Sequence, residues 1–251
     1  MGSVAKMCHQ HQAATNIITA SEVMGLAAMA GLNTKEVFDT VVRSTGWSWM
    51  FENRGPHMLA NDWLTVHSAV SIILKDVRIV TQHADSVGFP LVLANTAQQL
   101  YIAGTHQGYA KEDDAGLVRL YLAADSKDAV GKLAKASVST SGKAGITAET
   151  IVDLLRGLHL ASTRECLAFA AFVGMDLELL VDIINRGAGG SKIFEATSQS
   201  IIQGKNVTMA GVEGVEEIRQ RLESGLVKSR SIHQSMPMVG AALEQMYYKS
   251  N

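Results

Sequence analysis

The sequence predicts an almost entirely α-helical protein built as two tandem helical bundles. Only three prolines occur in 251 residues, and long stretches lack the Gly, Pro, Asn and Asp clusters that mark turns. Few segments alternate apolar and polar residues with the period of two that a half-buried strand requires. A content of 47% hydrophobic and 18% charged residues suffices to bury one or two ordinary cores. We therefore expect an all-α fold without a β-sheet.

The longest predicted helix opens the chain, over residues 4–30. Ala, Met, Ile and Leu dominate this stretch without a proline, and Gly31 supplies the left-handed residue that ends many helices. Such a helix is roughly 40 Å long. His9 and Gln10 follow Lys6 by three and four residues, so the three side chains share one face of the helix. This face continues with small and apolar residues. A cation, an imidazole and an amide therefore gather at the N-terminal end of a stripe that otherwise predicts burial.

Shorter helices follow in the first half of the chain. One begins near Asn33 and Thr34, with Glu36 in its first turn. Apolar spacing, glycine stops and capping aspartates predict the others at residues 49–59, 67–87, 91–107 and 113–121. The next stretch is rich in Ser, Lys, Gly and Ala and has no aromatic residue, which is typical of a linker. These patterns predict a first domain at 1–125, a linker at 126–147 and a second domain at 148–251.

The second half of the chain repeats the first at an offset of 143 residues. The matched pairs are Glu22 and Glu165, Gly31 and Gly174, Asp39 and Asp182, Arg43 and Arg186, Gly46 and Gly189, Ser48 and Ser191, Phe51 and Phe194, and Glu52 and Glu195. At the same offset, the positions of Lys6, His9 and Gln10 hold Glu149, Val152 and Asp153. We expect the second domain to be a diverged copy that keeps the packing of the first and has lost its polar cluster.

Charge and cysteine content exclude several classes of function. A formal net charge of −2 without a basic block offers no surface for a nucleic-acid backbone. Charged residues interrupt the apolar stretches, so we expect no membrane span. Cys8 and Cys166 lie far apart inside helical patterns, which indicates reduced thiols in a cytoplasmic protein. His9 and His11 point to different faces of a helix and have no neighbouring ligands at metal spacing, so we expect no metal.

The first helix carries a motif that resembles a known family. The residues are Gly2, Lys6, His9, Gln10, Glu22, Gly31 and Leu32. They resemble the opening of the C-terminal helical domain of the β-hydroxyacid dehydrogenases, the group of the 3-hydroxyisobutyrate and 6-phosphogluconate dehydrogenases. The histidine and glutamine that follow the lysine resemble the branch that acts on four-carbon sugar acids of the threonate and erythronate type. The resemblance implies that both bundles have the fold of the 6-phosphogluconate dehydrogenase C-terminal domain.

The resemblance also implies roles for the polar cluster. Lys6 would be the catalytic residue, which accepts the hydroxyl proton or stabilises the oxygen as hydride leaves the substrate carbon. Partial burial of Lys6 on the apolar stripe would favour its neutral form. His9 and Gln10 would bind the hydroxyl or carboxylate groups of a small hydroxy acid. Pattern alone also fits a snorkelling Lys6 with His9 and Gln10 at a frayed chain terminus.

Lys75 and Asp76 resemble the Lys-Asp pair that the family carries beside the nicotinamide end of the cofactor. Lys75 shares a helix face with Ile72 and Ile79, an apolar neighbourhood in which a lysine is unusual. The resemblance implies that Lys75 and Asp76 contact NAD or NADP. The alternative is that Lys75 snorkels past the isoleucines while Asp76 makes an ion pair on the helix surface.

Two functions remain open from the sequence. No βαβ segment with a glycine fingerprint is recognisable, and the glycines at 187–190 lack a preceding strand. One interpretation is the helical, substrate-binding and dimerising part of an NAD- or NADP-dependent dehydrogenase that oxidises a four-carbon sugar acid such as threonate. Its dinucleotide domain would then be absent from this sequence, and the chain would be inactive by itself. The other interpretation is a non-catalytic helical module for dimerisation or other interactions.

Overall fold

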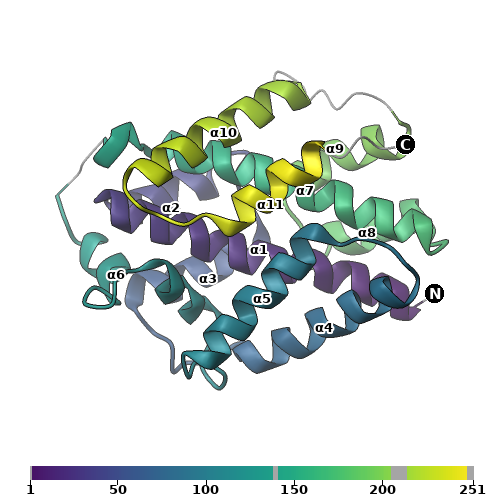
Figure 1. The fold of residues 1–251 in the computed structure, drawn as a ribbon, viewed down its shortest axis with the longest axis horizontal. Helices are drawn as coiled ribbons and strands as arrows, with labels where there is room; N and C mark the ends of the chain where they lie inside the picture. The colour runs from purple at the N-terminus through teal and green to yellow at the C-terminus, as the bar shows by residue number, and fades with distance from the viewer. Residues whose placement is uncertain (1, 138–140, 205–213, 248–251) are drawn as a thin grey trace.

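The computed structural model describes residues 2–137, 141–204 and 214–247, and these are almost entirely helical (Figure 1). The elements in chain order are α1 Gly2–Ala30, α2 Thr34–Val42, α3 Trp49–Ala60, α4 Val70–Ser86, α5 Val92–His106, the 3₁₀ helix η1 Asp114–Tyr121, α6 Ala129–Leu133, η2 Lys143–Gly145, α7 Ala148–Phe172, α8 Leu177–Asn185, α9 Lys192–Ile202, α10 Val215–Ser231 and α11 Pro237–Tyr247. Within these residues the only β-type pairings are two isolated bridges. The all-α prediction is therefore confirmed.

Helix α1 runs through the middle of the molecule, and the other helices surround it (Figure 1). Nearly every residue from His11 to Ala30 is buried, because α1 packs against α3, α4, α7 and η1 on different sides. Its end follows the sequence prediction, since Gly31 has a φ of +82°. Among the described helices, α1 alone is long and apolar enough to cross a membrane, but 94% of its most apolar window is buried inside the protein.

The helices of the second half reproduce the spacing of the first. Helix α8 begins and ends 143 residues after α2, and Ser48 and Ser191 are the N-caps of α3 and α9. These two serines also face each other in an antiparallel bridge. Around it, the Trp49 N–H donates to the Gly190 carbonyl at 3.0 Å, and the Lys192 N–H donates to Trp47 at 3.1 Å. Two segments that lie 143 residues apart in sequence therefore meet each other directly.

Two buried carboxylates connect the halves in a reciprocal way. Glu22 of α1 accepts the backbone N–H groups of Met238 and Val239, at the start of α11, at 3.0 and 3.1 Å. Glu165 of α7 accepts those of Leu93 and Ala94, at the start of α5, at 2.9 and 3.0 Å. A glutamate side chain suits a helix N-terminus because its two oxygens can accept unpaired backbone N–H groups. Each half therefore caps a helix of the other.

The segment expected as a linker is packed against the first half. Residues 126–147 contain α6 and η2. The Thr34 hydroxyl donates to the Val130 carbonyl at 2.6 Å, and the Asn33 side chain donates to Ala136 at 2.8 Å. One cluster of buried hydrophobic residues also extends across both halves. The absence of a side chain at Gly131 lets this segment approach the C-terminal end of α3 closely.

Candidate functional site

His9 lies near the N-terminal end of α1 with a half-buried ring. Its Nε2 atom accepts a hydrogen bond from the Gly189 N–H, at 3.2 Å, in the turn after α8. Burial lowers the pKa of the ring, and the hydrogen bond with the Gln10 side chain acts in the opposite direction. A neutral ring whose Nε2 accepts a hydrogen bond carries its proton on Nδ1. His9 is therefore a neutral imidazole of defined tautomer.

Gln10 connects α1 to α4. Its Nε2 atom donates to Oδ2 of Asp76 at 2.5 Å, and the other oxygen of Asp76 lies 3.1 Å from the Lys75 amine. The Asp76 side chain is only 12% exposed, whereas the Lys75 side chain is 63% exposed. Because an ionised carboxylate only accepts hydrogen bonds, it fixes the orientation of the Gln10 amide. The structure brings the side chains of His9, Gln10, Asp76 and Lys75 together in one series of polar contacts, which we call the relay.

Lys6 lies one turn before the relay and is exposed. The expectation that Lys6 is partly buried on the apolar stripe is wrong. Ala5 and Cys8 take the core-facing positions at this end of α1, and Lys6 is on the opposite side, facing solvent. The amine is consequently free to meet a small molecule that approaches the N-terminal end of α1.

The apolar neighbourhood of Lys75 is also at the surface. Ile72 and Ile79, which share its helix face, are 49% and 48% exposed. An open groove of about 410 Å³ runs along this face of α4, and its lining includes Lys75, Arg78, Ile79 and Thr105. The groove combines two cations with apolar surface. Such a lining suits a ligand that carries both a planar ring and phosphate groups.

The equivalent positions in the second half are arranged differently. Glu149 is exposed and Val152 is buried, so neither lysine nor imidazole is present there. Asp153 accepts hydrogen bonds from Arg156 at 3.2 Å and from Arg221 of α10 at 3.0 Å. The helix pair α7 and α10 is therefore joined by an ion pair where α1 and α4 are joined through the Gln10 amide.

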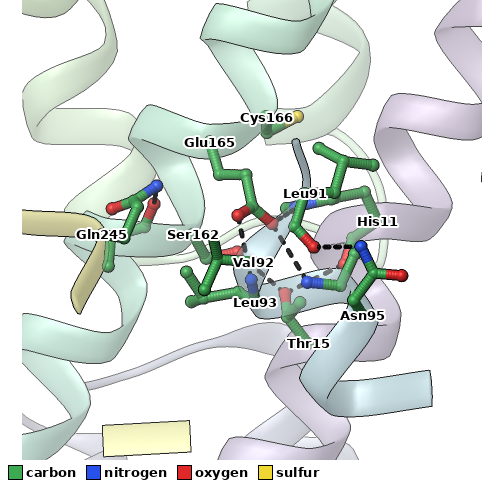
Figure 2. Close-up of polar contacts among 12 residues, drawn as sticks. His11, Thr15, Leu91, Val92, Leu93, Asn95, Ser162, Glu165, Cys166 and Gln245 are labelled. Carbon is green, nitrogen blue, oxygen red and sulfur yellow. Dashed lines mark hydrogen bonds and ion pairs between the residues drawn. The ribbon is translucent and has the colours of Figure 1, made fainter. Parts of the chain in front are cut away.

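A buried polar network that the sequence did not reveal lies deeper along α1. Figure 2 shows the Glu165 carboxylate extending from α7 toward His11 of α1 and toward the backbone of α5. The His11 Nε2 atom lies 2.8 Å from Glu165, and the Thr15 and Ser162 hydroxyls share a hydrogen bond of 2.8 Å. The partners are about 150 residues apart in sequence, so no local pattern could have indicated them. The network holds the α1, α5 and α7 helices together.

The cysteines and possible metal ligands show no further site in the described part of the chain. Cys8 and Cys166 are free and buried, and the Cys166 thiol donates to the Cys8 carbonyl at 3.5 Å. No group of three or more His, Cys, Asp or Glu side chains among the described residues is placed to hold a metal ion.

Comparison with known proteins places this geometry in a family. The family model described as the NAD-binding region of NADP-dependent 3-hydroxyisobutyrate dehydrogenase matches residues 1–121 and 143–247. The chain belongs to this family. The resemblance found in the sequence is thereby confirmed at the level of the family, and NAD(P) use belongs to its chemistry.

Individual relatives cover about half of the chain. L-threonate dehydrogenase of Escherichia coli strain K12 is 40% identical over 121 residues, which are 48% of this chain and 40% of that protein. The NAD-dependent L-serine dehydrogenase of Pseudomonas aeruginosa is 28% identical over 127 residues, 48% of this chain and 42% of that protein. A solved 3-hydroxyisobutyrate dehydrogenase from Salmonella typhimurium matches with 40% identity and a TM-score of 0.47, covering 48% of this chain and 42% of that one. The chain spans about two fifths of the length of these relatives.

One expectation about the cofactor is corrected by the family match. We expected binding of NAD or NADP mainly through a domain absent from this sequence. The matching family covers the helices themselves and is described as NAD-binding, so that expectation is wrong. The assignment rested on the missing glycine fingerprint, which identifies one type of dinucleotide site and says nothing about cofactor contacts made by helices.

Proposed function

We propose that this chain takes part in the NAD(P)-dependent oxidation of a β-hydroxy acid, specifically a four-carbon sugar acid such as L-threonate. The observation that carries the proposal is the relay, which places the predicted substrate residues His9 and Gln10 in contact with the predicted cofactor residues Lys75 and Asp76. Membership of the family and the similarity to L-threonate dehydrogenases support the same chemistry. The relay joins two residue pairs that lie 66 positions apart in sequence.

The chemistry assigns Lys6 the catalytic role. A bound nicotinamide would supply the hydride acceptor for the carbinol carbon of the acid. The Lys6 amine accepts the hydroxyl proton of the same carbon, or stabilises the oxygen as charge develops. The neutral His9 and the oriented Gln10 amide bind the remaining hydroxyl and carboxylate oxygens. Rigid placement on α1 reduces the entropy lost when these groups engage the substrate.

The groove on α4 is the proposed contact for the cofactor. Lys75 and Arg78 supply positive charge for phosphate oxygens, and Ile79 supplies an apolar surface for a ring. The Asp76 carboxylate contacts both the Lys75 amine, proposed to bind the cofactor, and the Gln10 amide, proposed to bind the substrate. The side chains present therefore fit a dinucleotide.

For the organisation of the chain we propose a tandem repeat of two helical bundles, residues 1–125 and 148–251, with 126–147 connecting them. The equal spacing of α2 and α8, the paired N-caps Ser48 and Ser191, and the reciprocal helix caps support it. The family model also matches a separate segment in each half. The second bundle keeps the packing without the lysine. A cytoplasmic location, supported by the two free cysteines, and assembly as a homodimer stay predictions.

The proposal is tested by measuring binding and turnover with the purified chain. NAD and NADP are titrated calorimetrically, and L-threonate, erythronate, 3-hydroxyisobutyrate and L-serine are then compared by nicotinamide absorbance. We expect saturable binding of one nucleotide and the highest kcat/KM with a four-carbon acid. Absence of both nucleotide binding and turnover would contradict the proposal and favour a non-catalytic helical module. Higher kcat/KM with 3-hydroxyisobutyrate would contradict the substrate assignment alone.

A further inference from the structure

The turn after α8 in the second half of the chain touches His9 at two glycines. The Gly189 N–H donates to Nε2 of His9 at 3.2 Å. At Gly187, a Cβ atom would lie 2.4 Å from Nε2 and 2.9 Å from Cδ2 of the same ring. Real Cβ atoms do not approach other heavy atoms this closely. The His9 ring therefore occupies its position only because residue 187 has no side chain.

This contact determines which ring nitrogen carries the proton. A backbone N–H can only donate, so Nε2 of His9 must accept and the proton of the neutral ring lies on Nδ1. The Gln10 side chain is the hydrogen-bond partner of the His9 ring on its own helix, and the Gln10 Nε2 atom donates to Asp76. The Gly189 N–H can only donate and the Asp76 carboxylate can only accept. These two groups therefore fix the direction of hydrogen-bond donation along the relay.

The first half has a glycine turn that packs in a similar way, since a Cβ at Gly46 would meet the Val152 carbonyl at 3.3 Å, but it makes no hydrogen bond to a ring. Gly46 is the equivalent of Gly189 at the offset of 143 residues, and Val152 is the equivalent of His9. The Gly46 N–H donates to the Ser44 hydroxyl at 3.0 Å, and Val152 has no side-chain acceptor. Of the two glycine turns, only the one in the second half therefore contacts an imidazole, that of His9 in the first half.

We propose that Gly187 and Gly189 are positioning residues for substrate binding, which hold His9 in its Nδ1–H tautomer and keep the relay oriented. The second bundle, which lacks the lysine, thereby completes the site of the first bundle. The inference rests on the proposed function only for the identity of the ligand. The tautomer of His9 follows from the contact itself and is measured without any ligand.

The test uses ¹⁵N spectra of the histidine rings of the full chain at neutral pH, with the His9 signals assigned by their loss in His9→Gln. We expect a protonated Nδ1 and an unprotonated Nε2 in the unmodified protein. Gly187→Ala should displace the ring from Gly189, shift these signals toward a mixture of tautomers, and raise KM for the hydroxy acid about tenfold with a smaller change in kcat. Gly190→Ala is the matched control, since a Cβ there would meet carbonyl oxygens of the turn at 3.3 Å and not His9.

Several outcomes would overturn the inference. A proton on Nε2 of His9 in the unmodified protein would do so without any glycine variant, even if Gly187→Ala fails to fold. Equal effects of Gly187→Ala and Gly190→Ala on the ring signals would show that only general turn strain is involved. Unchanged KM beside a changed tautomer would remove the positioning role. Absence of all turnover in the unmodified chain would instead count against the proposed function, while the ring signals would still decide the tautomer.

Discussion

Glu22 gives a quantitative prediction about stability. Its side chain is fully buried and accepts the backbone N–H groups of Met238 and Val239 at the start of α11. Burial is the largest effect and raises the pKa of the carboxyl group from 4.5 to about 8, while the two N–H donors act in the opposite direction. The native protein therefore keeps a proton on Glu22 at pH values where the unfolded chain has released it.

The direction of the pH dependence follows from this difference. Between pH 4.5 and about 8 the native state binds one more proton than the unfolded state, so the free energy of unfolding falls as the pH rises. The slope for one proton is about 1.4 kcal/mol per pH unit, which amounts to about 5 kcal/mol over the whole window. Glu22→Gln has no ionisable group at this position. The unfolding free energy of the wild type minus that of Glu22→Gln should therefore fall by about 1.4 kcal/mol for each unit of rising pH within this window.

The assay is urea unfolding at constant ionic strength from pH 4 to pH 9, with each free energy obtained by linear extrapolation. Glu149→Gln removes one exposed carboxylate and serves as a control, with an expected change within about 0.5 kcal/mol. If the difference curve for Glu22→Gln is flat, the two N–H donors and the helix dipole hold the carboxylate ionised and outweigh burial. That result would refute the reasoning.

Three further substitutions address the site and the core. Lys6→Met should lower turnover about a hundredfold or more with a stability change below about 1 kcal/mol, measured by kinetics and urea unfolding against Glu149→Gln, because it removes the amine and keeps the stem. Asp76→Asn should raise KM for the hydroxy acid about tenfold, since its amide no longer fixes the orientation of Gln10. His159→Leu should raise the melting temperature, because in the described structure neither ring nitrogen has a hydrogen-bond partner. Burial lowers the pKa of His159 to about 3, so the wild type should lose stability relative to this variant as the pH falls from 6.5 to 3.

Local signals in the sequence were enough for most helix boundaries. Helix α1 was expected at residues 4–30 and spans Gly2–Ala30. The predicted start of α2 is confirmed by the Asn33 side chain, which accepts the Glu36 N–H at 3.0 Å. Caps and glycine stops depend on neighbouring residues only, so a sequence reports them well.

Boundaries set by distant contacts were predicted less well. Helix α4 was expected to begin at residue 67 and begins at Val70. The His67 and Ser68 N–H groups donate to the Asp113 side chain at 2.7 and 3.2 Å, and Ala69 pairs with Asp113 in an isolated bridge. These contacts keep the segment extended before α4. The partner is more than 40 residues away in sequence, so the apolar period alone overestimated the helix.

The same distinction applies to the site. The resemblance indicated two pairs of residues, His9 with Gln10 and Lys75 with Asp76, and the structure shows that the pairs touch. The contact of His9 with Gly189 spans 180 positions and could not be read from the chain. From the sequence, the glycines at 187–190 indicated only a turn that ends a helix. Exposure of Lys6 was likewise missed, because helical periodicity identifies a face without showing which neighbours cover it.

The two halves differ in what each requires of the other. Glu22 and Glu165 cap helices across the interface in both directions, so loss of either glutamate would leave two N–H groups at the end of a buried helix without an acceptor. The contact with His9 is made in one direction only, because its counterpart is Val152. Packing thus constrains both copies of the proposed repeat, whereas the chemistry constrains the first copy and the glycine turn of the second. On this argument the second bundle can change at the exposed Glu149 without loss of function, but it cannot change at Gly187.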